Sequence, residues 1–241
     1  MAITSEQLCR RYSLPDIQLA TKNFDEERVI GHGGFGKVYK GHIDEERGGS
    51  TSVAIKRLDS MSNQGAPEFT TEVEMLSKLR HAHLVSLLGC CDDGEEMILV
   101  YEYMPNGTLY HHLHNSNTPL SWMQRLRIWI GAARGLDHLH TGPTGQRRQC
   151  DVNGLGLLLM EILTGKPAPS DYMGREHWSP KVALAYVEDL VDPRMRLKDT
   201  ELERARELLS LILKCTSYHY TMEQALKELE QIYSRMKRRF F

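Results

Sequence analysis

The sequence lacks the patterns that mark several special classes of protein. Cysteine is scarce: the 241-residue chain has five, and no two of them stand in a Cys-x-x-Cys pair. Disulfide frameworks and structural zinc sites need cysteines at short, regular spacings, so neither is expected. A reducing compartment, and so a cytoplasmic location, fits this usage best.

Long apolar runs and a strong net charge are also missing. The longest apolar run, Leu155–Met160, is far shorter than the ~18 residues of a membrane span. The first residues, MAITSEQLCRRYSLPD, contain no signal-peptide core. Lys and Arg number 30 against 32 Asp and Glu, a balance that gives no argument for binding nucleic acid. We therefore expect a soluble chain with no transmembrane segment.

The hydrophobic pattern predicts a mixed first half and a helical second half. Ser13, as N-cap, begins a short helix that ends near Asn23. Three strands, a helix and two strands are expected next, at residues 29–30, 38–40, 52–56, 67–80, 83–89 and 97–103. Helices are expected in the second half at residues 121–140, 152–163, 201–213 and 222–238. The first of these opens with a Ser121/Gln124 capping box, and the second is apolar at eight of twelve positions, which indicates burial.

A glycine-rich turn is the first feature that carries chemistry. Residues 31–36, GHGGFG, match the GxGxxG pattern that dinucleotide-binding folds and protein kinases share. A dinucleotide fingerprint opens a helix and is followed about 20 residues later by an acid. Here the next residues favour a strand, and Lys56 stands at the later position. This is the kinase arrangement, in which the turn covers the phosphates and the lysine supplies positive charge. The alternative is a surface hairpin with an exposed lysine.

Glu72 is the expected partner of Lys56. It lies on the apolar side of the helix predicted at residues 67–80, and a carboxylate in that position needs a cationic partner. Glu68 and Glu74 compete for the lysine, but their angular positions suit the pair less well. The alternative is that Glu72 lies at the rim of a solvated helix.

Five motifs follow one another between Arg11 and Leu139. They are IGHGGFGKVYKG, VAIKRL, FTTEVEMLSKLRHAHLVSLLGCC, MILVYEYMPNGTL and SWMQRLRIWIGAARGLDHLH. Together they resemble the plant receptor-like protein kinases, most closely the malectin-type receptor kinases. The resemblance implies an α+β, two-lobed protein-kinase-like fold: an N-terminal flanking helix in residues 1–24, an ATP-binding N-lobe in 25–104 and a helical C-lobe in 105–241.

The resemblance also implies where ATP binds. Tyr101 would be the gatekeeper, and the backbone of Glu102 and Met104 would meet the edge of the adenine. Val38 and Ala54 would form the apolar roof over the base. The implied ATP-binding residues are Ile30, Gly31, His32, Gly33, Gly34, Phe35, Gly36, Val38, Ala54, Lys56, Tyr101, Glu102 and Met104, and the implied ion pair is Lys56 with Glu72.

The parts of a kinase that transfer phosphate are missing. HRDxxxxN, DFG and APE supply the base, the metal ligands and the anchor of the activation segment, and none of them occurs in this sequence. Only ten residues, TGPTGQRRQC, separate His140 from Asp151, whereas the three motifs together need about 14. We therefore expect an intact N-lobe, a C-lobe without catalytic loop or activation segment, and no catalytic residues. The helix at residues 152–163 should then be partly uncovered, and the C-lobe loose.

Two other groups of residues suggest a metal ion. Asp151 and Asn153 have suitable oxygens for Mg²⁺, but Asp151 is expected to cap the buried helix instead. His111, His112 and His114 have no partner at zinc spacing and are expected to line a polar edge. No metal site is expected, and the binding of ATP should not depend on Mg²⁺.

Three functions remain open. The first is a pseudokinase-like relative of receptor-like serine/threonine kinases, which binds ATP and serves signalling as a binding module. It would join a membrane receptor kinase complex at the inner face of the plasma membrane. The second is an active ATP-dependent protein serine/threonine kinase whose catalytic segment is missing from an incomplete transcript. The third is a non-functional remnant.

Overall fold

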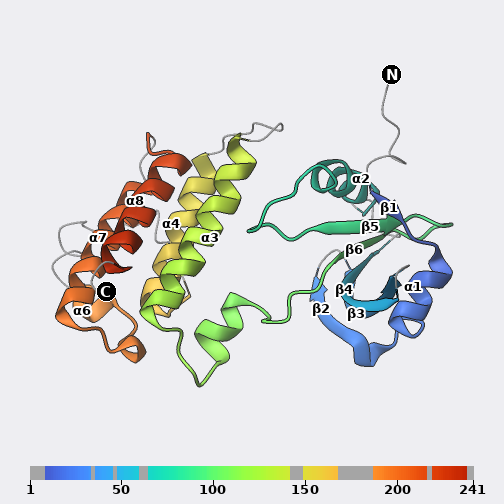
Figure 1. Cartoon of the computed structure of the whole chain (residues 1–241), viewed down its shortest axis with the longest axis horizontal. Coiled ribbons are helices and arrows are strands. Elements are labelled where there is room, and N and C mark those ends of the chain that lie inside the picture. The colour runs from blue at the N-terminus through green and yellow to red at the C-terminus, as the bar shows by residue number, and fades with distance from the viewer. Residues whose placement is uncertain are drawn as a thin grey trace. The chain divides into compact units, whose positions relative to one another are not determined.

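The computed structural model describes residues 9–33, 36–45, 48–59, 65–141, 149–167, 187–215 and 219–237, whose course is drawn in Figure 1. The chain forms two compact units, residues 1–106 and 107–241. The first contains a β-sheet with helices, and the second is helical. This is the α+β class that the sequence predicts.

A six-stranded sheet forms the centre of the first unit, in the order β1-β5-β6-β4-β3-β2. The strands are β1 Arg10–Arg11, β2 Val29–Gly33, β3 Gly36–Glu45, β4 Gly49–Leu58, β5 Leu87–Cys91 and β6 Ile98–Glu102. Neighbouring strands are antiparallel except β1, which runs parallel to β5 at the edge of the sheet. The sequence did not predict β1, because two residues show no periodicity.

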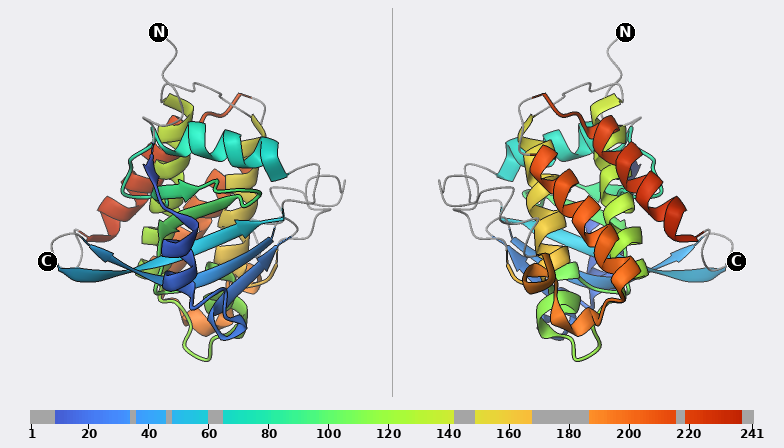
Figure 2. Two further views of the ribbon diagram at one scale, coloured as in Figure 1. Left: turned by 90° about the vertical axis from the view of Figure 1, so that its right-hand side faces the viewer. Right: turned by 90° about the vertical axis from the view of Figure 1, so that its left-hand side faces the viewer.

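Two helices cover opposite faces of this sheet (Figure 2). Helix α1, Leu14–Thr21, begins at the predicted Ser13 cap and buries Ile17 against the face that carries Ile55. Helix α2, Gly65–Leu76, packs Val73 against the other face. Successive residues of a strand point to opposite faces, so Lys56 of β4 lies on the α2 side.

Strands β2, β3 and β4 are longer than predicted, and two predicted boundaries between α2 and β5 are wrong. Helix α2 ends at Leu76 rather than at residue 80, and β5 begins at Leu87 rather than at residue 83. Turns occupy part of the segment between them, and the amide of Leu84 donates to the carbonyl of His81 at 3.0 Å. Apolar residues in this segment imitate helix and strand patterns although the chain turns there.

The second unit is a set of helices whose four longest members lie side by side (Figure 1). They are α3 Trp122–Thr141, α4 Gln149–Thr164, α7 Asp199–Cys215 and α8 Met222–Lys237. Shorter elements are a π-helix at His111–Asn115, α6 at Val187–Leu190 and a 3-10 helix at Pro193–Met195. The predicted capping box of α3 is confirmed, because the amide of Ser121 donates to Gln124 Oε1 at 2.8 Å. Arg238, the predicted end of α8, lies outside the described residues.

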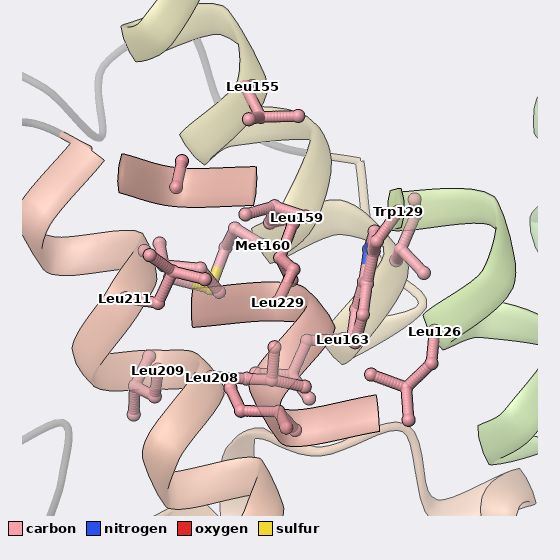
Figure 3. Close-up of a cluster of buried hydrophobic side chains, with 14 of the residues drawn as sticks. Leu126, Trp129, Leu155, Leu159, Met160, Leu163, Leu208, Leu209, Leu211 and Leu229 are labelled. Atoms are coloured by element: carbon pink, nitrogen blue, oxygen red, sulfur yellow. The ribbon is translucent and has the colours of Figure 1, made fainter. Parts of the chain in front are cut away.

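Helix α4 is buried among its neighbours. Leu155, Leu159 and Leu163 are each at most 1% exposed, and they lie in one cluster with Trp129 of α3 and Leu229 of α8 (Figure 3). Leu157 and Leu158, on another side of the helix, are only partly buried, so the expectation that the helix is partly uncovered is confirmed for that side alone. Helices α7 and α8 are amphipathic and turn their apolar faces inward, so they cover the side of α4 that carries Leu155 and Leu159.

A buried ion pair joins α3 to the segment after α6. Arg125 Nη2 donates to Asp192 Oδ2 at 2.5 Å, and the two side chains are 0% and 2% exposed. Asp192 also accepts from Arg194 Nε at 2.9 Å. Its backbone amide donates to the carbonyl of Leu163 at 3.0 Å, so the pair also fixes the end of α4.

Candidate functional site

One face of the sheet carries several of the predicted nucleotide-binding residues. The strand register places Val38 opposite Lys56 and Ala54 opposite Tyr101. Residues directly opposite each other in a sheet share a face, and so do residues two apart on one strand. Gly31 pairs with Val38 and would place a Cβ atom 3.8 Å from the Val38 Cβ. All five residues therefore lie on the α2 side of the sheet.

Lys56 lies between two carboxylates of α2. Its Nζ is 3.0 Å from Glu72 Oε1 and 2.9 Å from Glu68 Oε1. All three side chains are between 20% and 26% exposed. The expectation that Glu68 suits the lysine less well is wrong. Glu68 precedes Glu72 by four residues, so both carboxylates lie on the same side of the helix, and this spacing could have identified the second partner.

Burial and hydrogen bonds shift the pKa values of two members of the cluster, Lys56 and Tyr101. Burial acts to lower the pKa of Lys56, but its hydrogen bonds to Glu68 and Glu72 outweigh that effect and raise it. The hydroxyl of Tyr101 donates to Glu72 Oε2, and burial, together with this bond, raises the pKa of Tyr101. At neutral pH Lys56 is a cation and Tyr101 a neutral donor. Both oxygens of Glu72 are therefore engaged.

The glycine-rich turn joins β2 to β3. Gly36 has φ +133°, and a Cβ atom there would lie 2.0 Å from the Arg57 carbonyl oxygen, so no other residue fits. Gly33 has no heavy atom within 4 Å of a Cβ position, and His32 beside it is exposed. Ile30 lies at an irregularity in the pairing and is 48% exposed. The predicted residues Gly34 and Phe35 lie outside the described residues.

The segment after β6 carries the predicted hinge. Glu102 is held by Ser86, whose carbonyl accepts from the Glu102 amide at 3.1 Å and whose amide donates to Glu102 Oε1 at 2.9 Å. The side chain of Met104 is 55% exposed. Among the described residues, none forms a recorded hydrogen bond with the Met104 backbone, so its amide can donate to a ligand.

The residues that suggested a metal ion have protein partners. Asp151 lies in the first turn of α4, which begins at Gln149, so the expectation that Asp151 caps this helix is wrong. Its Oδ2 is 2.8 Å from His140 Nε2, and His114 Nε2 is 2.8 Å from Glu161 Oε1. Over the described ranges, no three His, Cys, Asp or Glu side chains gather in a way that could hold a metal ion.

No helix within the described part of the chain is long and apolar enough to cross a membrane.

Comparison with known proteins identifies the family. The model of the protein tyrosine and serine/threonine kinase family matches residues 24–144. A probable receptor-like protein kinase of Arabidopsis thaliana is 58% identical over 163 residues, which cover 66% of this chain and 18% of that protein. The receptor-like protein kinases FERONIA and ANXUR1 of the same plant are 50% and 48% identical over 202 residues. Each alignment covers 83% of this chain, but only 22% of FERONIA and 23% of ANXUR1.

The chain spans about a fifth of the length of the curated relatives that it matches. The sheet of the first unit and the helices of the second agree with a kinase-like fold. The resemblance predicted from the motifs is thus confirmed, and the chain belongs to the protein kinase family, among the plant receptor-like protein kinases.

Proposed function

We propose that the first unit binds ATP on the sheet face that carries Val38, Ala54 and Lys56, and that the chain transfers no phosphate. The position of Lys56 is the main support. A protonated lysine on this face supplies positive charge for phosphates, and Glu72 holds its ammonium group in place. Val38 and Ala54 on the same face offer apolar contact to a flat base.

The other contacts follow from this placement. The backbone of Gly31, His32 and Gly33 covers the phosphates, with Gly34, Phe35 and Gly36 completing the turn and Ile30 at its start. The backbone of Glu102 and Met104 meets the edge of the adenine. The Met104 amide, which bonds to none of the described residues, and the exposed residues His32 and Gly33 support these assignments. ATP fits the residues present because the site combines a lysine, the exposed Gly33 and apolar side chains.

Binding should be weak, because Lys56 already has two carboxylate partners. Glu68 and Glu72 give the cluster an excess of negative charge, which opposes the approach of phosphate. When ATP binds, a phosphate oxygen replaces Glu68 beside the ammonium group, while Glu72 stays. Mg²⁺ adds little, because the motifs that would hold it are missing from the sequence.

The absence of phosphate transfer rests on the sequence. HRDxxxxN, DFG and APE are absent, and residues 141–150 contain no Asp, Glu or Asn. A positioned base and metal-held phosphates supply most of the rate in this reaction. The chain would then act as a nucleotide-dependent binding module, in a complex with a membrane receptor kinase at the inner face of the plasma membrane. The similarity to receptor-like kinases supports that location.

A second function, that of an active receptor-like serine/threonine kinase, is favoured by one observation. An alignment of 202 residues within a chain of 241 must cross residues 141–150, so the similarity to FERONIA continues on both sides of the short connection. A catalytic segment lost from an incomplete transcript would leave this pattern. Sequencing the transcript across the codons for His140 to Asp151 separates the two functions.

Isothermal titration of the full chain with ATP, without added metal, tests the first proposal. We expect a dissociation constant in the high micromolar to millimolar range. The binding free energy should be less favourable, by about 1 kcal/mol or more, than that of a site with an unshared lysine. No detectable binding at millimolar ATP would contradict the proposal.

A further inference from the structure

Two cysteines that are far apart in the sequence meet at the edge of the sheet. Cys9 directly precedes β1, and Cys90 lies in β5. Both are free thiols, and their Sγ atoms are 3.0 Å apart. A disulfide bond measures about 2.05 Å, so a movement of about 1 Å separates this contact from a covalent bond.

The backbone around this thiol pair is packed closely enough to hold Cys9 in place. Arg10 pairs with Gly89 in the parallel bridge, and the amide of Tyr12 donates to the Cys90 carbonyl at 2.9 Å. A Cβ atom on Gly89 would lie 2.3 Å from the Arg10 oxygen and 2.6 Å from the Tyr12 ring. Only glycine permits this approach, so the position of Cys9 follows from the strand pairing itself.

Polar contacts on the following residues support the same position. Arg11 forms an ion pair with Asp92, and the amide of Leu14 donates to Asp93 Oδ2 at 2.8 Å. These contacts fix the chain on the C-terminal side of Cys9 against the end of β5. The contact between the two sulfur atoms therefore follows from the docking of the segment that begins at Cys9 against β5.

The two thiols differ in how an oxidant can reach them. Cys90 is 2% exposed, whereas Cys9 is only half-buried. Burial raises the pKa of Cys90 to about 12, so this group remains a thiol at neutral pH. Cys91, the next residue, packs on the opposite face with the cluster around Ile17. An oxidant therefore meets Cys9 first, and Cys90 is the thiol beside it.

We propose that Cys9 and Cys90 form a reversible disulfide when the chain meets a peroxide, and that this bond fastens the segment before α1 to β5. Hydrogen peroxide oxidises the Cys9 thiol to a sulfenic acid and releases one water. The Cys90 sulfur then attacks the Cys9 sulfur, the S–O bond breaks, and the Cys90 proton leaves with the hydroxide as a second water. Two thiols and one peroxide give one disulfide and two waters.

The bond would close a loop between residues 81 positions apart in the sequence. Cross-links over long loops restrict the unfolded chain and so stabilise the folded state. We expect the thermal unfolding midpoint of the first unit to rise by several degrees after oxidation, and the amides of Arg10 to Tyr12 to exchange more slowly. A thiol reductant should reverse both effects.

Peptide mapping of the full chain tests the proposal, in a Cys150→Ser background that removes the exposed cysteine. After treatment with hydrogen peroxide and alkylation of free thiols, trypsin gives Cys9 in residues 1–10 and Cys90 with Cys91 in residues 81–125. We expect these two peptides to be linked without reductant and separate with it. Cys91→Ala is the matched control and should keep the link, whereas Cys90→Ala should lose it.

The outcomes are distinguishable even if a variant folds poorly, because the background protein alone must show the link. The proposal is overturned if, after peroxide treatment, Cys9 is recovered as an alkylated free thiol, or is oxidised to sulfinic acid without forming the disulfide. A link that survives in Cys90→Ala assigns the bond to Cys91 and overturns it too. A link that forms only in urea-unfolded protein would show that the native contact does not produce it.

Discussion

At the scale of single residues, the sharing of one ammonium group between two carboxylates determines what the candidate site can do. Glu72 is held from two sides, by Lys56 and by the Tyr101 hydroxyl. Among the described residues, Glu68 has a recorded contact only with Lys56. We therefore assign different roles to two carboxylates that carry the same charge. Glu72 positions the lysine, and Glu68 competes with the ligand.

Substitution of each carboxylate by its amide tests this assignment. Glu68→Gln removes a competing charge, so ATP should bind more tightly, by a factor of about 2 to 5 for a partly buried pair. Glu72→Gln removes the same charge and also turns one of the two oxygens that accept from Lys56 and Tyr101 into an amide donor, so ATP should bind more weakly than to the parent. Calorimetric titration at constant ionic strength measures both. Equal responses of the two variants would mean that only the net charge matters.

The sequence predicted part of this cluster for physical reasons. Lys56 follows the last glycine of the turn by 20 residues, and this spacing carries the signal. The role of Glu72 as a partner of Lys56 could be predicted from the helical periodicity of α2. The hydrogen bond from Tyr101 could not be predicted, because it depends on how far β6 lies from α2 in space.

At the scale of elements, the buried pair of Arg125 and Asp192 joins three parts of the second unit. Arg125 comes from α3, Asp192 follows α6, and the amide of Asp192 bonds to the end of α4. Removing one member of a buried pair leaves the other without compensation. Removing one member should therefore cost more stability than removing one member of a surface pair on the same helices.

We expect Asp192→Asn to destabilise the second unit by about 3 to 5 kcal/mol. Glu230→Gln is the matched control. It breaks the exposed pair between Arg134 and Glu230, whose side chains are 47% and 44% exposed, and should cost less than about 1 kcal/mol. Urea unfolding followed by tryptophan fluorescence measures both, because Trp122 and Trp129 are buried in this unit. Similar losses in the two variants would contradict the assigned role of the buried pair.

The pair should also make stability depend on pH. Burial acts to raise the pKa of Asp192, but hydrogen bonds from Arg194 and Arg125 outweigh it and lower the pKa. A carboxyl whose folded pKa is depressed contributes stability above its unfolded value, about 3.9, and loses it as the pH falls through the folded value. The stability difference between the parent and Asp192→Asn should therefore shrink below about pH 4. A difference that stays constant between pH 7 and pH 2 would contradict this origin.

Elements with strong periodicity and clear caps could be predicted, and those without could not. The Ser13 and Ser121 caps correctly predicted where α1 and α3 begin. The apolar content of α4 predicted that most of this helix is buried. Strand β1 forms because it pairs with β5, which lies far along the chain, and no local sequence pattern predicts it. For the same reason, the contact between Cys9 and Cys90 appears only in the structure.

At the scale of the whole molecule, the chain combines a sheet unit that has the predicted nucleotide-binding residues with a helical unit that closes around α4. The expected exposure of α4 is limited to the side that carries Leu157 and Leu158, because composition shows that a helix must be covered but not which helices cover it. The apolar faces of α7 and α8 supply that cover in the described structure. Amides of α4 should therefore exchange slowly with solvent in purified protein.

We expect the purified chain to transfer no phosphate to itself or to a generic substrate such as myelin basic protein. The sequence has neither the base nor the metal ligands that supply most of the rate. Incubation with radiolabelled ATP, with and without Mg²⁺, measures this. Label transfer that persists in Lys56→Met would indicate a contaminating kinase, whereas transfer abolished by Lys56→Met would show that the chain is an active enzyme.

Binding of ATP on the Lys56 face of the sheet can be tested by comparing two lysine variants. Lys37 on β3 is opposite Arg57, so it points to the other face and is the matched control for Lys56. Titration with ATP should give the parent and Lys37→Met the same weak affinity, with or without Mg²⁺. Lys56→Met should lose about tenfold or more, as expected for a lost charged hydrogen bond. Parent-like affinity in Lys56→Met, or binding that appears only with Mg²⁺, would contradict the account.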